Sequence, residues 1–303
     1  NNVTSFDQDN RAGNPNLKPE ITTTKEYGVD LRFFGNRLTL DVAYFQSDIE
    51  DAILNASLAP SSGFTPKWVN AGIMESDGWE VTLGAKPIVS ENFNWSTTLN
   101  WSKRETLVKQ LAPRVERLFL AGFQTAGTYL VEGLPYGAIV GGAYLREEAG
   151  TASDTSLSIP GGAIVIDPAT GYQDIDNTQR VIGDPNPDWT GGIGTVISYK
   201  NISLSAQFET SQGNDVWTGT EGVLKYFGIH PETANESVAT QDLRVYQSTD
   251  IIAAGTTFRG NIKDFGDGPV ALTQEWYTAE GGGFGNVTEG FVQDASWTRL
   301  REV

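Results

Sequence analysis

The chain contains no cysteine, a single histidine and no long apolar run, and each absence excludes a class of function. Without cysteine there is no disulfide, thiol nucleophile or cysteine-ligated zinc. A multi-histidine metal site or a histidine-based triad would have to be built around His230 alone. No stretch approaches the ~20 apolar residues that a transmembrane helix requires. We therefore expect no catalytic residue set, no metal, no cofactor and no helical membrane span.

Basic residues are also scarce, since 21 Lys and Arg face 38 Asp and Glu and the net charge is -17. Nucleic-acid binding requires clustered Lys and Arg, so nucleic acid is excluded as a partner. Many acids lie in long connecting segments, for example Asp167, Asp174 and Asp176. A solvated acidic surface explains them, with weak divalent-cation sites as the alternative. Their spacing does not match a 12-residue calcium loop, so we predict no metal there.

What the sequence has instead is alternation of apolar and polar residues. In residues 93–104, Phe93, Trp95, Leu99 and Trp101 fall on one parity, and polar residues fall on the other. The segments that alternate in the same way are 27–33, 37–46, 78–86, 190–200 and 202–209, and a seventh strand begins near Asp294. Successive side chains of a strand point to opposite faces, so the pattern predicts strands with one apolar and one polar face. A soluble β-sandwich also alternates and remains an alternative.

The connections between these segments differ greatly in length. Residues 34–36 and 200–201 are tight turns, whereas 51–77, 110–189 and 213–290 are long. Compact soluble domains rarely carry such loops, but bacterial barrels combine short periplasmic turns with long extracellular loops. Eight strand residues tilted near 40° also span roughly 20 Å, close to the apolar band of a membrane barrel. The predicted fold class is all-β, part of an antiparallel transmembrane β-barrel with long extracellular loops.

Several segments carry a resemblance to a known family. They are NPNLKPE (14–20), EYGVD (26–30), NRLTLDVAYF (36–45), NAGIM (70–74), GWE (78–80), RVIGDPNPDWTGG (180–192), SYKNISL (198–204), GNDVW (213–217) and ASWTRLREV (295–303). In this order and spacing the chain resembles the barrel of TonB-dependent outer-membrane transporters, and within them the SusC/RagA-like group of Bacteroidota.

The resemblance implies a Gram-negative outer-membrane protein that imports a bulky nutrient, a glycan or a peptide. Such proteins form a barrel of 22 strands closed by an N-terminal plug. The implied partners are a SusD-like surface lipoprotein, the TonB complex acting through the plug, and outer-membrane lipid. The match covers the C-terminal portion of the barrel, so residues 1–303 are expected to be one barrel segment, with the plug and the final closing strands outside this chain. An open sheet edge is not tolerated in hydrocarbon, which agrees with that expectation.

Ligand and partner contacts are predicted from position alone. Aromatic faces stack on sugars and pack against proteins, so the candidates are loop aromatics. They are Trp68, Tyr144, Trp217, Trp276 and Tyr277. The alternative is that these side chains pack the loops onto themselves. Polar strand residues predicted to line the conduit or to contact the plug are Arg32, Asp41, Glu80, Asn100 and Glu209.

Two other functions stay open at this stage. A small outer-membrane barrel or adhesin without transport would lack a plug, and an eighth strand for it could lie within residues 110–189. A soluble carbohydrate-binding or hydrolytic β-domain would need no detergent for extraction.

Overall fold

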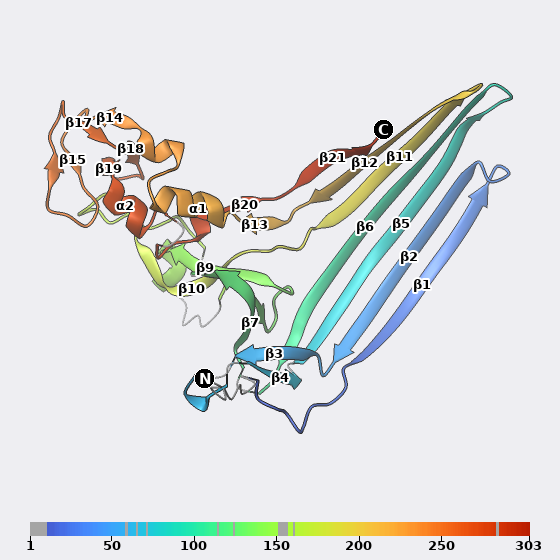
Figure 1. Ribbon diagram of the computed structural model, residues 1–303, viewed down its shortest axis with the longest axis horizontal. Helices are drawn as coiled ribbons and strands as arrows, with labels where there is room; N and C mark the ends of the chain where they lie inside the picture. The colour runs from blue at the N-terminus through green and yellow to red at the C-terminus, as the bar shows by residue number, and fades with distance from the viewer. Residues whose placement is uncertain are drawn as a thin grey trace, which may run out of the picture.

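The computed structural model describes residues 11–57, 60–64, 66–70, 72–113, 115–123, 125–150, 157–159, 161–282 and 285–303. Its largest element is an antiparallel sheet of seven strands (Figure 1). In spatial order the strands are β1 (Ile21–Phe33), β2 (Leu38–Glu50), β5 (Gly72–Val89), β6 (Phe93–Leu111), β11 (Trp189–Tyr199), β12 (Ile202–Gln212) and β21 (Trp297–Glu302). The six strands predicted from alternation are confirmed, and the seventh, expected to begin near Asp294, begins at Trp297. They extend further than predicted at the loop end, where β5 begins at Gly72.

The strand register brings residues of one parity together across the sheet. One row, which is apolar in every strand, consists of Leu31, Leu40, Leu83, Leu99, Ile193, Phe208 and Leu300. The neighbouring row on the opposite face consists of Asp30, Asp41, Thr82, Asn100, Gly192, Glu209 and Arg299. The pleat directs these two rows to opposite sides of the sheet. We call the sides the apolar face and the polar face.

Short turns join the strands at one end of the sheet, and long loops join them at the other (Figure 1). The turn between β1 and β2 places Phe34, Gly35 and Asn36 at positive φ, as tight hairpin turns require. Within the described residues the sheet does not close, because β1 and β21 each pair on one side only. The predicted arrangement of a partial barrel with loops at one end is therefore confirmed.

The first two long loops carry strands of their own. The loop between β2 and β5 contains the hairpin of β3 (Ile53–Ser57) and β4 (Pro66–Asn70), with the 3₁₀ helix η1 (Pro60–Ser62) at its tip. The loop at 112–188 contains a four-stranded sheet and the 3₁₀ helix η2 (Glu147–Gly150). Its strands are β7 (Arg117–Phe123), β8 (Ala126–Val131), β9 (Ala138–Tyr144) and β10 (Ile175–Gly183). They form a sheet separate from the seven strands, so this loop supplies no eighth wall strand among the described residues.

The loop at 213–296 is built from short helices and paired strands. The strand pairs are β13 (Asp215–Trp217) with β20 (Val292–Asp294), β14 (Glu236–Val238) with β17 (Thr257–Arg259), β15 (Leu243–Arg244) with β16 (Ile251–Ile252), and β18 (Asn261–Asp264) with β19 (Pro269–Leu272). The helices are α1 (Gly219–Tyr226), η3 (Pro231–Ala234), α2 (Gln274–Ala279) and η4 (Glu289–Phe291). No helix in the described part of the chain has both the length and the apolar character to cross a membrane.

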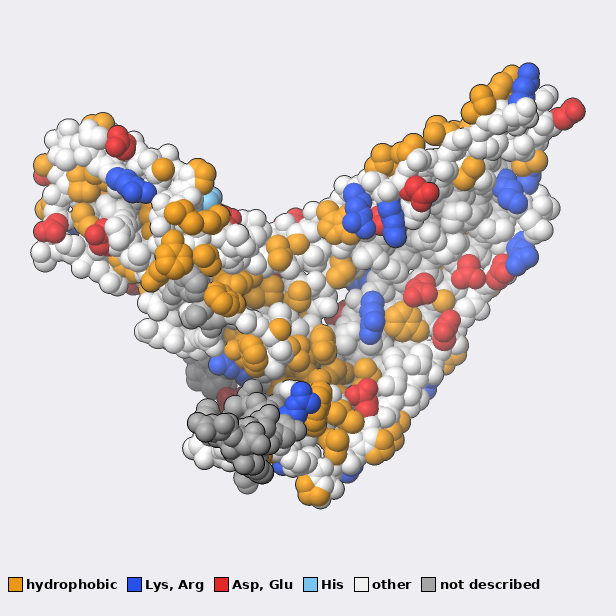
Figure 2. All heavy atoms as spheres, viewed as in Figure 1, with side chains coloured by type: hydrophobic (Ala, Val, Ile, Leu, Met, Phe, Trp, Pro, Cys, Tyr) orange, Lys and Arg blue, Asp and Glu red, His pale blue; other side chains and the backbone are white. Residues whose placement is uncertain are grey.

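Buried apolar side chains gather in the loops and at the loop end of the sheet. One cluster joins Met74 and Val108 of the sheet to Leu118 and Leu130 of the loop at 112–188. In contrast, the apolar face stays exposed, with 39% of Leu31 and 51% of Leu300 accessible. Figure 2 shows charged side chains of both signs over the sheet and apolar ones gathered toward the loops. The loops therefore have cores of their own, and the apolar face needs cover from outside the chain.

Candidate functional site

The polar face carries two hollows that follow each other toward the loops. The one nearer the middle of the sheet has a volume of ≈ 530 Å³, and Glu80, Asn100, Glu209 and Trp297 contribute to its lining. The second, of ≈ 380 Å³, lies at the loop end and is lined by Arg104, Thr106, Tyr136 and Asn186 among others. Ser102 and Thr190 line both hollows, and their hydroxyl oxygens are 2.7 Å apart. Together they form a continuous surface along the wall, with both polar and apolar groups in its lining.

Charged side chains are paired across the edge of this surface. Glu209 of β12 accepts a hydrogen bond of 3.1 Å from Arg299 of β21 and also pairs with Arg301. A bulge between Gln207 and Phe208 shifts the register of this strand pair. The shift places Arg301 in reach of the same carboxylate, because a bulge re-aims the side chains beside it. The polar face thus presents two guanidinium groups around one carboxylate.

The two longest loops dock on each other. Thr288, just before η4, donates its backbone N–H to the Gly142 carbonyl of β9 at 2.9 Å. The Gly142 N–H in turn donates to the Thr288 hydroxyl at 3.0 Å. A side chain at Gly142 would collide with the Asn286 backbone, so glycine is required for this close approach. We call the docked pair of loops, 112–188 and 213–296, the cap.

An ion pair at the same contact is largely buried. Glu289 accepts from the Tyr144 N–H at 3.1 Å and from Arg146 Nη2 at 2.8 Å. Only 12% of the Glu289 side chain and 21% of the Arg146 side chain are exposed. Burial raises the pKa of the Glu289 carboxyl in spite of the neighbouring guanidinium. Burial also raises the pKa of the Tyr144 hydroxyl, with Glu280 and Glu289 adding to the effect.

Shared apolar clusters complete the docking. Tyr172 of the loop at 112–188 is 3% exposed and packs with Tyr246 and Val270 of the other loop. Its hydroxyl donates to the Ala271 carbonyl at 2.6 Å. In a second cluster, Ile182 and its neighbours pack against Trp217 and Val292. Because both loops contribute to each cluster, the cap has a common core.

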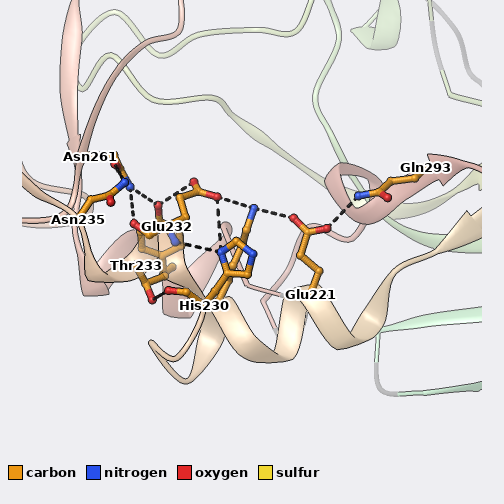
Figure 3. Close-up of polar contacts among 9 residues, drawn as sticks. Glu221, His230, Glu232, Thr233, Asn235, Asn261 and Gln293 are labelled. Atoms are coloured by element: carbon orange, nitrogen blue, oxygen red, sulfur yellow. Dashed lines mark hydrogen bonds and ion pairs between the residues drawn. The ribbon is translucent and has the colours of Figure 1, made fainter.

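A polar network holds the loop at 213–296 together (Figure 3). Lys225 of α1 lies 2.9 Å from Glu221 Oε1 and 2.8 Å from Glu232 Oε2. Burial alone would lower the pKa of Lys225, but the two carboxylates outweigh it and hold that pKa above its ordinary value. Gln293 of β20 donates to Glu221 Oε2 at 2.9 Å. The lysine therefore joins α1 to η3, and the network reaches β20 at the end of the loop through Glu221.

The same network includes the sole histidine. The Tyr277 hydroxyl donates to Glu232 Oε1 at 2.9 Å and accepts from Asn261 Nδ2 at 2.8 Å. His230 Nδ1 accepts the Glu232 backbone N–H at 3.2 Å and so caps the 3₁₀ helix η3 (Figure 3). These contacts stabilise the fold of the loop, and the capping contact gives His230 a structural role.

The five predicted aromatic contact residues lie at different depths. Trp68 of β4 is 43% exposed. Tyr144, Trp217 and Trp276 are half-buried, and Tyr277 is only 4% exposed. Trp217 and Trp276 each pack against an apolar cluster of the cap. Trp68 alone of the five presents a large free face, and a ligand role for these residues stays a prediction.

The polar strand residues fall together on one face. Asp41, Asn100 and Glu209 occupy one cross-strand row, and Arg32 and Glu80 lie two residues away from that row on the same side of their strands. Sequence reasoning missed Tyr136, because it lies in a loop without periodicity. It also gave Arg299 and Arg301 no site role, although both follow Asp294, near which a seventh strand was predicted to begin.

The acidic loop residues have other partners. Asp167 accepts from the Ala169 N–H and the Thr170 hydroxyl, each at 2.8 Å. Asp176 pairs with Arg180 at 2.8 Å, and both side chains are buried. In the described part of the chain, no group of three or more His, Asp or Glu residues is arranged to hold a metal ion.

Comparison with known proteins identifies the family of this chain. The sequence model of the family described as "TonB dependent receptor-like, beta-barrel" matches residues 2–161. The chain belongs to this family. It is 31% identical over 215 residues to the TonB-dependent receptor P3 of Formosa agariphila, a match that covers 67% of this chain and 21% of the receptor. It is 32% identical over 98 residues to the TonB-dependent receptor SusC of Bacteroides thetaiotaomicron, covering 31% of this chain and 10% of SusC.

Solved structures show the same fold. The RagAB peptide importer in its "closed-closed" state aligns with 99% of this chain and 30% of its own chain, at a TM-score of 0.65 and 19% identity. The RagAB peptide transporter aligns at a TM-score of 0.62 and 17% identity. The SusC/RagA-like resemblance and the partial-barrel fold are thus confirmed. The chain spans only about a fifth of the length of the P3 receptor.

The dimensions of the apolar face fit a wall in a membrane. On this face Tyr27, Tyr44 and Trp79 align near the loop end, and Phe93, Tyr199 and Ile202 align near the turns. The 11 residues of β11 extend between these two levels. At about 3.3 Å per residue and a tilt near 40°, they span roughly 25 Å, the height of the apolar band of outer-membrane barrels.

Proposed function

We propose that this chain forms part of the wall and the outer cap of an outer-membrane, TonB-dependent importer of a bulky nutrient, an oligosaccharide or a peptide. The observation that carries the proposal is the two-faced sheet, in which one face has a row of side chains that is apolar in all seven strands and the neighbouring row on the other face is mostly polar. A soluble domain would have to leave that apolar row in water, which is costly. Hydrocarbon outside and a polar conduit inside satisfy both faces.

The cap supports a role in nutrient capture. Its two loops share a core and stand at the end of the sheet where the chain leaves the wall. The surface formed by the two hollows continues from Tyr136 and Arg104 to Glu209 and Trp297. Aromatic and charged groups of this kind bind sugars and peptides by stacking and charge-assisted hydrogen bonds. In the proposed importer a SusD-like lipoprotein covers the cap, and the TonB complex acts through a plug.

Thiol labelling tests the orientation of the wall, because this chain has no native cysteine. Asn100→Cys and Leu99→Cys are adjacent on β6 and point to opposite faces. In intact outer membranes of cells expressing the whole receptor, a water-soluble maleimide should label Asn100→Cys and leave Leu99→Cys unlabelled until detergent is added. Equal labelling of both without detergent would contradict a lipid-facing apolar side.

Import itself is tested by deletion of the gene for the whole receptor. Uptake of labelled oligosaccharide and peptide pools should fail for one of these classes and return when the gene is restored. The tagged receptor, purified in mild detergent, should bring a surface lipoprotein with it. Unchanged uptake of both pools would refute the importer function.

A further inference from the structure

The apolar face of the sheet is interrupted at Gly191. This residue pairs with Trp101 of β6 on one side and with Thr210 of β12 on the other. Trp189 and Ile193 flank it on the same face of β11, two residues away in each direction. Because glycine has no side chain, the ring of Trp189 can lie close over the backbone at this position. An apolar hollow of ≈ 470 Å³ lies there, with Leu99 and Phe208 also in its lining.

The position of the Trp189 ring leaves no room for a side chain at residue 191. A Cβ atom at position 191 would lie 3.1 Å from Cζ3 of that ring and 3.2 Å from the Asn100 carbonyl oxygen. Both distances are tighter than ordinary van der Waals contact, so a side chain at 191 would displace the ring and fill the space. Trp189 is 37% exposed and Ile193 is 45% exposed. The walls of the hollow are therefore large apolar surfaces that this chain does not cover.

The hollow lies close under the outer rim of the apolar band. Thr190, next to Trp189, pairs with Ser102, and Ser102 pairs with Glu80, next to Trp79. Trp189 is therefore level with Trp79 in the aromatic row near the loop end. The Thr210 hydroxyl at the border donates to the Trp297 carbonyl at 2.8 Å and accepts from Gln212 Nε2 at 2.7 Å. Since the border hydroxyl is already bonded, the hollow offers a guest almost only apolar contact.

We propose that this hollow binds a fatty acyl chain of an outer-membrane lipid. The proposal rests on the membrane placement of the wall proposed above. The hollow is continuous with the apolar rows that hydrocarbon covers, so its occupant comes from the same medium. Water is a poor occupant, because it needs two to four polar partners. An acyl chain seated between two indole rings gains contacts on several sides, whereas a chain against the flat wall gains them on one.

Two glycines on the same strand give a matched test. Gly191→Val fills the hollow, whereas Gly194→Val points to the polar face, where a Cβ atom meets nothing within 4 Å. Both changes add a β-branched residue to a strand, which favours the strand conformation. The whole receptor is delipidated in detergent, and binding of dipalmitoyl phosphatidylethanolamine is titrated by native mass spectrometry. Heat-dependent gel mobility verifies that each variant is folded.

The wild-type receptor and Gly194→Val should each retain one saturable lipid. Gly191→Val should bind it about tenfold more weakly, equivalent to the loss of roughly two buried methylene groups. Trp189→Ala, which removes one wall, should weaken binding in the same way. Equal lipid affinity in wild type and Gly191→Val, or only non-saturable binding in wild type, would overturn the proposal. Nutrient uptake by the gene-deletion strain is measured in parallel, because unchanged uptake there would refute the importer function alone and leave the lipid stoichiometry unaffected.

Discussion

Removing the Glu289 carboxylate is expected to loosen the contact between the two loops of the cap. Glu289 is the partner of Arg146 at 2.8 Å, and only 12% and 21% of the two side chains are exposed. Glu289→Ala leaves that guanidinium buried, and its Nε already has no hydrogen-bond partner. Breaking a buried ion pair by removing one partner costs about 3–5 kcal/mol. The remaining exposure points to the lower end, about 3 kcal/mol, or roughly 100-fold in the opening equilibrium.

One amide reports this opening directly. The Thr288 N–H donates to the Gly142 carbonyl across the two loops at 2.9 Å, so it exchanges with solvent only when they separate. Hydrogen exchange of peptides that contain residue 288, measured on the whole receptor in detergent, should accelerate about 100-fold in Glu289→Ala. Lys18→Met breaks an exposed pair of 3.8 Å with Asp51 and should change exchange at residue 288 by less than about twofold. If Glu289→Ala leaves the Thr288 amide as protected as in wild type, the ion pair does not hold the cap together.

Three further perturbations follow from other contacts. Burial raises the pKa of the Glu280 carboxyl above its ordinary 4.5, so the folded loop binds a proton that the unfolded loop releases. The free energy of unfolding therefore falls as the pH rises above 4.5. Glu280→Gln should raise the thermal midpoint of the cap at pH 7, and this gain should shrink toward pH 4. Ile193→Lys places a charge on the apolar face and should cost roughly 2–4 kcal/mol in folding into lipid vesicles, whereas Gly194→Lys on the polar face should cost little; equal costs would contradict the assigned faces. Arg180→Met removes the ion-pair partner of Asp176 at a place where the two side chains are only 7% and 8% exposed. Denaturant unfolding should show that the loop at 112–188 is destabilised by about 3–5 kcal/mol, and adding Asp176→Leu should restore the lost stability.

The strands and their faces could be predicted from the sequence, but their ends could not. Period-two alternation identified six of the seven strands because each of the six has an apolar surface on one side. Toward the loops the same parity carries Lys103 and Glu105 on β6 and Asp77 on β5, yet backbone pairing continues through them. The hydropathy pattern stops where the apolar band stops, whereas the hydrogen-bond ladder does not. Strand ends read from hydropathy are therefore too short at the loop end.

Loop packing was beyond sequence reasoning for a different reason. Arg146 and Glu289 are 143 positions apart, and no local pattern links them. Tyrosine and tryptophan serve equally well in a core or at a binding surface, so composition could not separate exposed Trp68 from buried Tyr277. The hollow at Gly191 was also unpredictable, because a glycine in a strand signals a bulge or a close approach as readily as a missing side chain.

The two parts of the molecule are stabilised by different surroundings. The cap has buried clusters shared between its loops, so its packing comes from the chain itself. The wall has exposed side chains on both faces, so in the proposed importer its stability depends on lipid on one side and polar contacts on the other. At the loop exits the Asp215 N–H donates to the Asp184 carbonyl at 2.7 Å, and Asp215 Oδ2 accepts from the Asp184 N–H at 2.9 Å. Because the loops are joined at these exits as well as in their cores, we expect the cap to move as one body about the strand ends. Only changes at the shared contacts should let the two loops move separately.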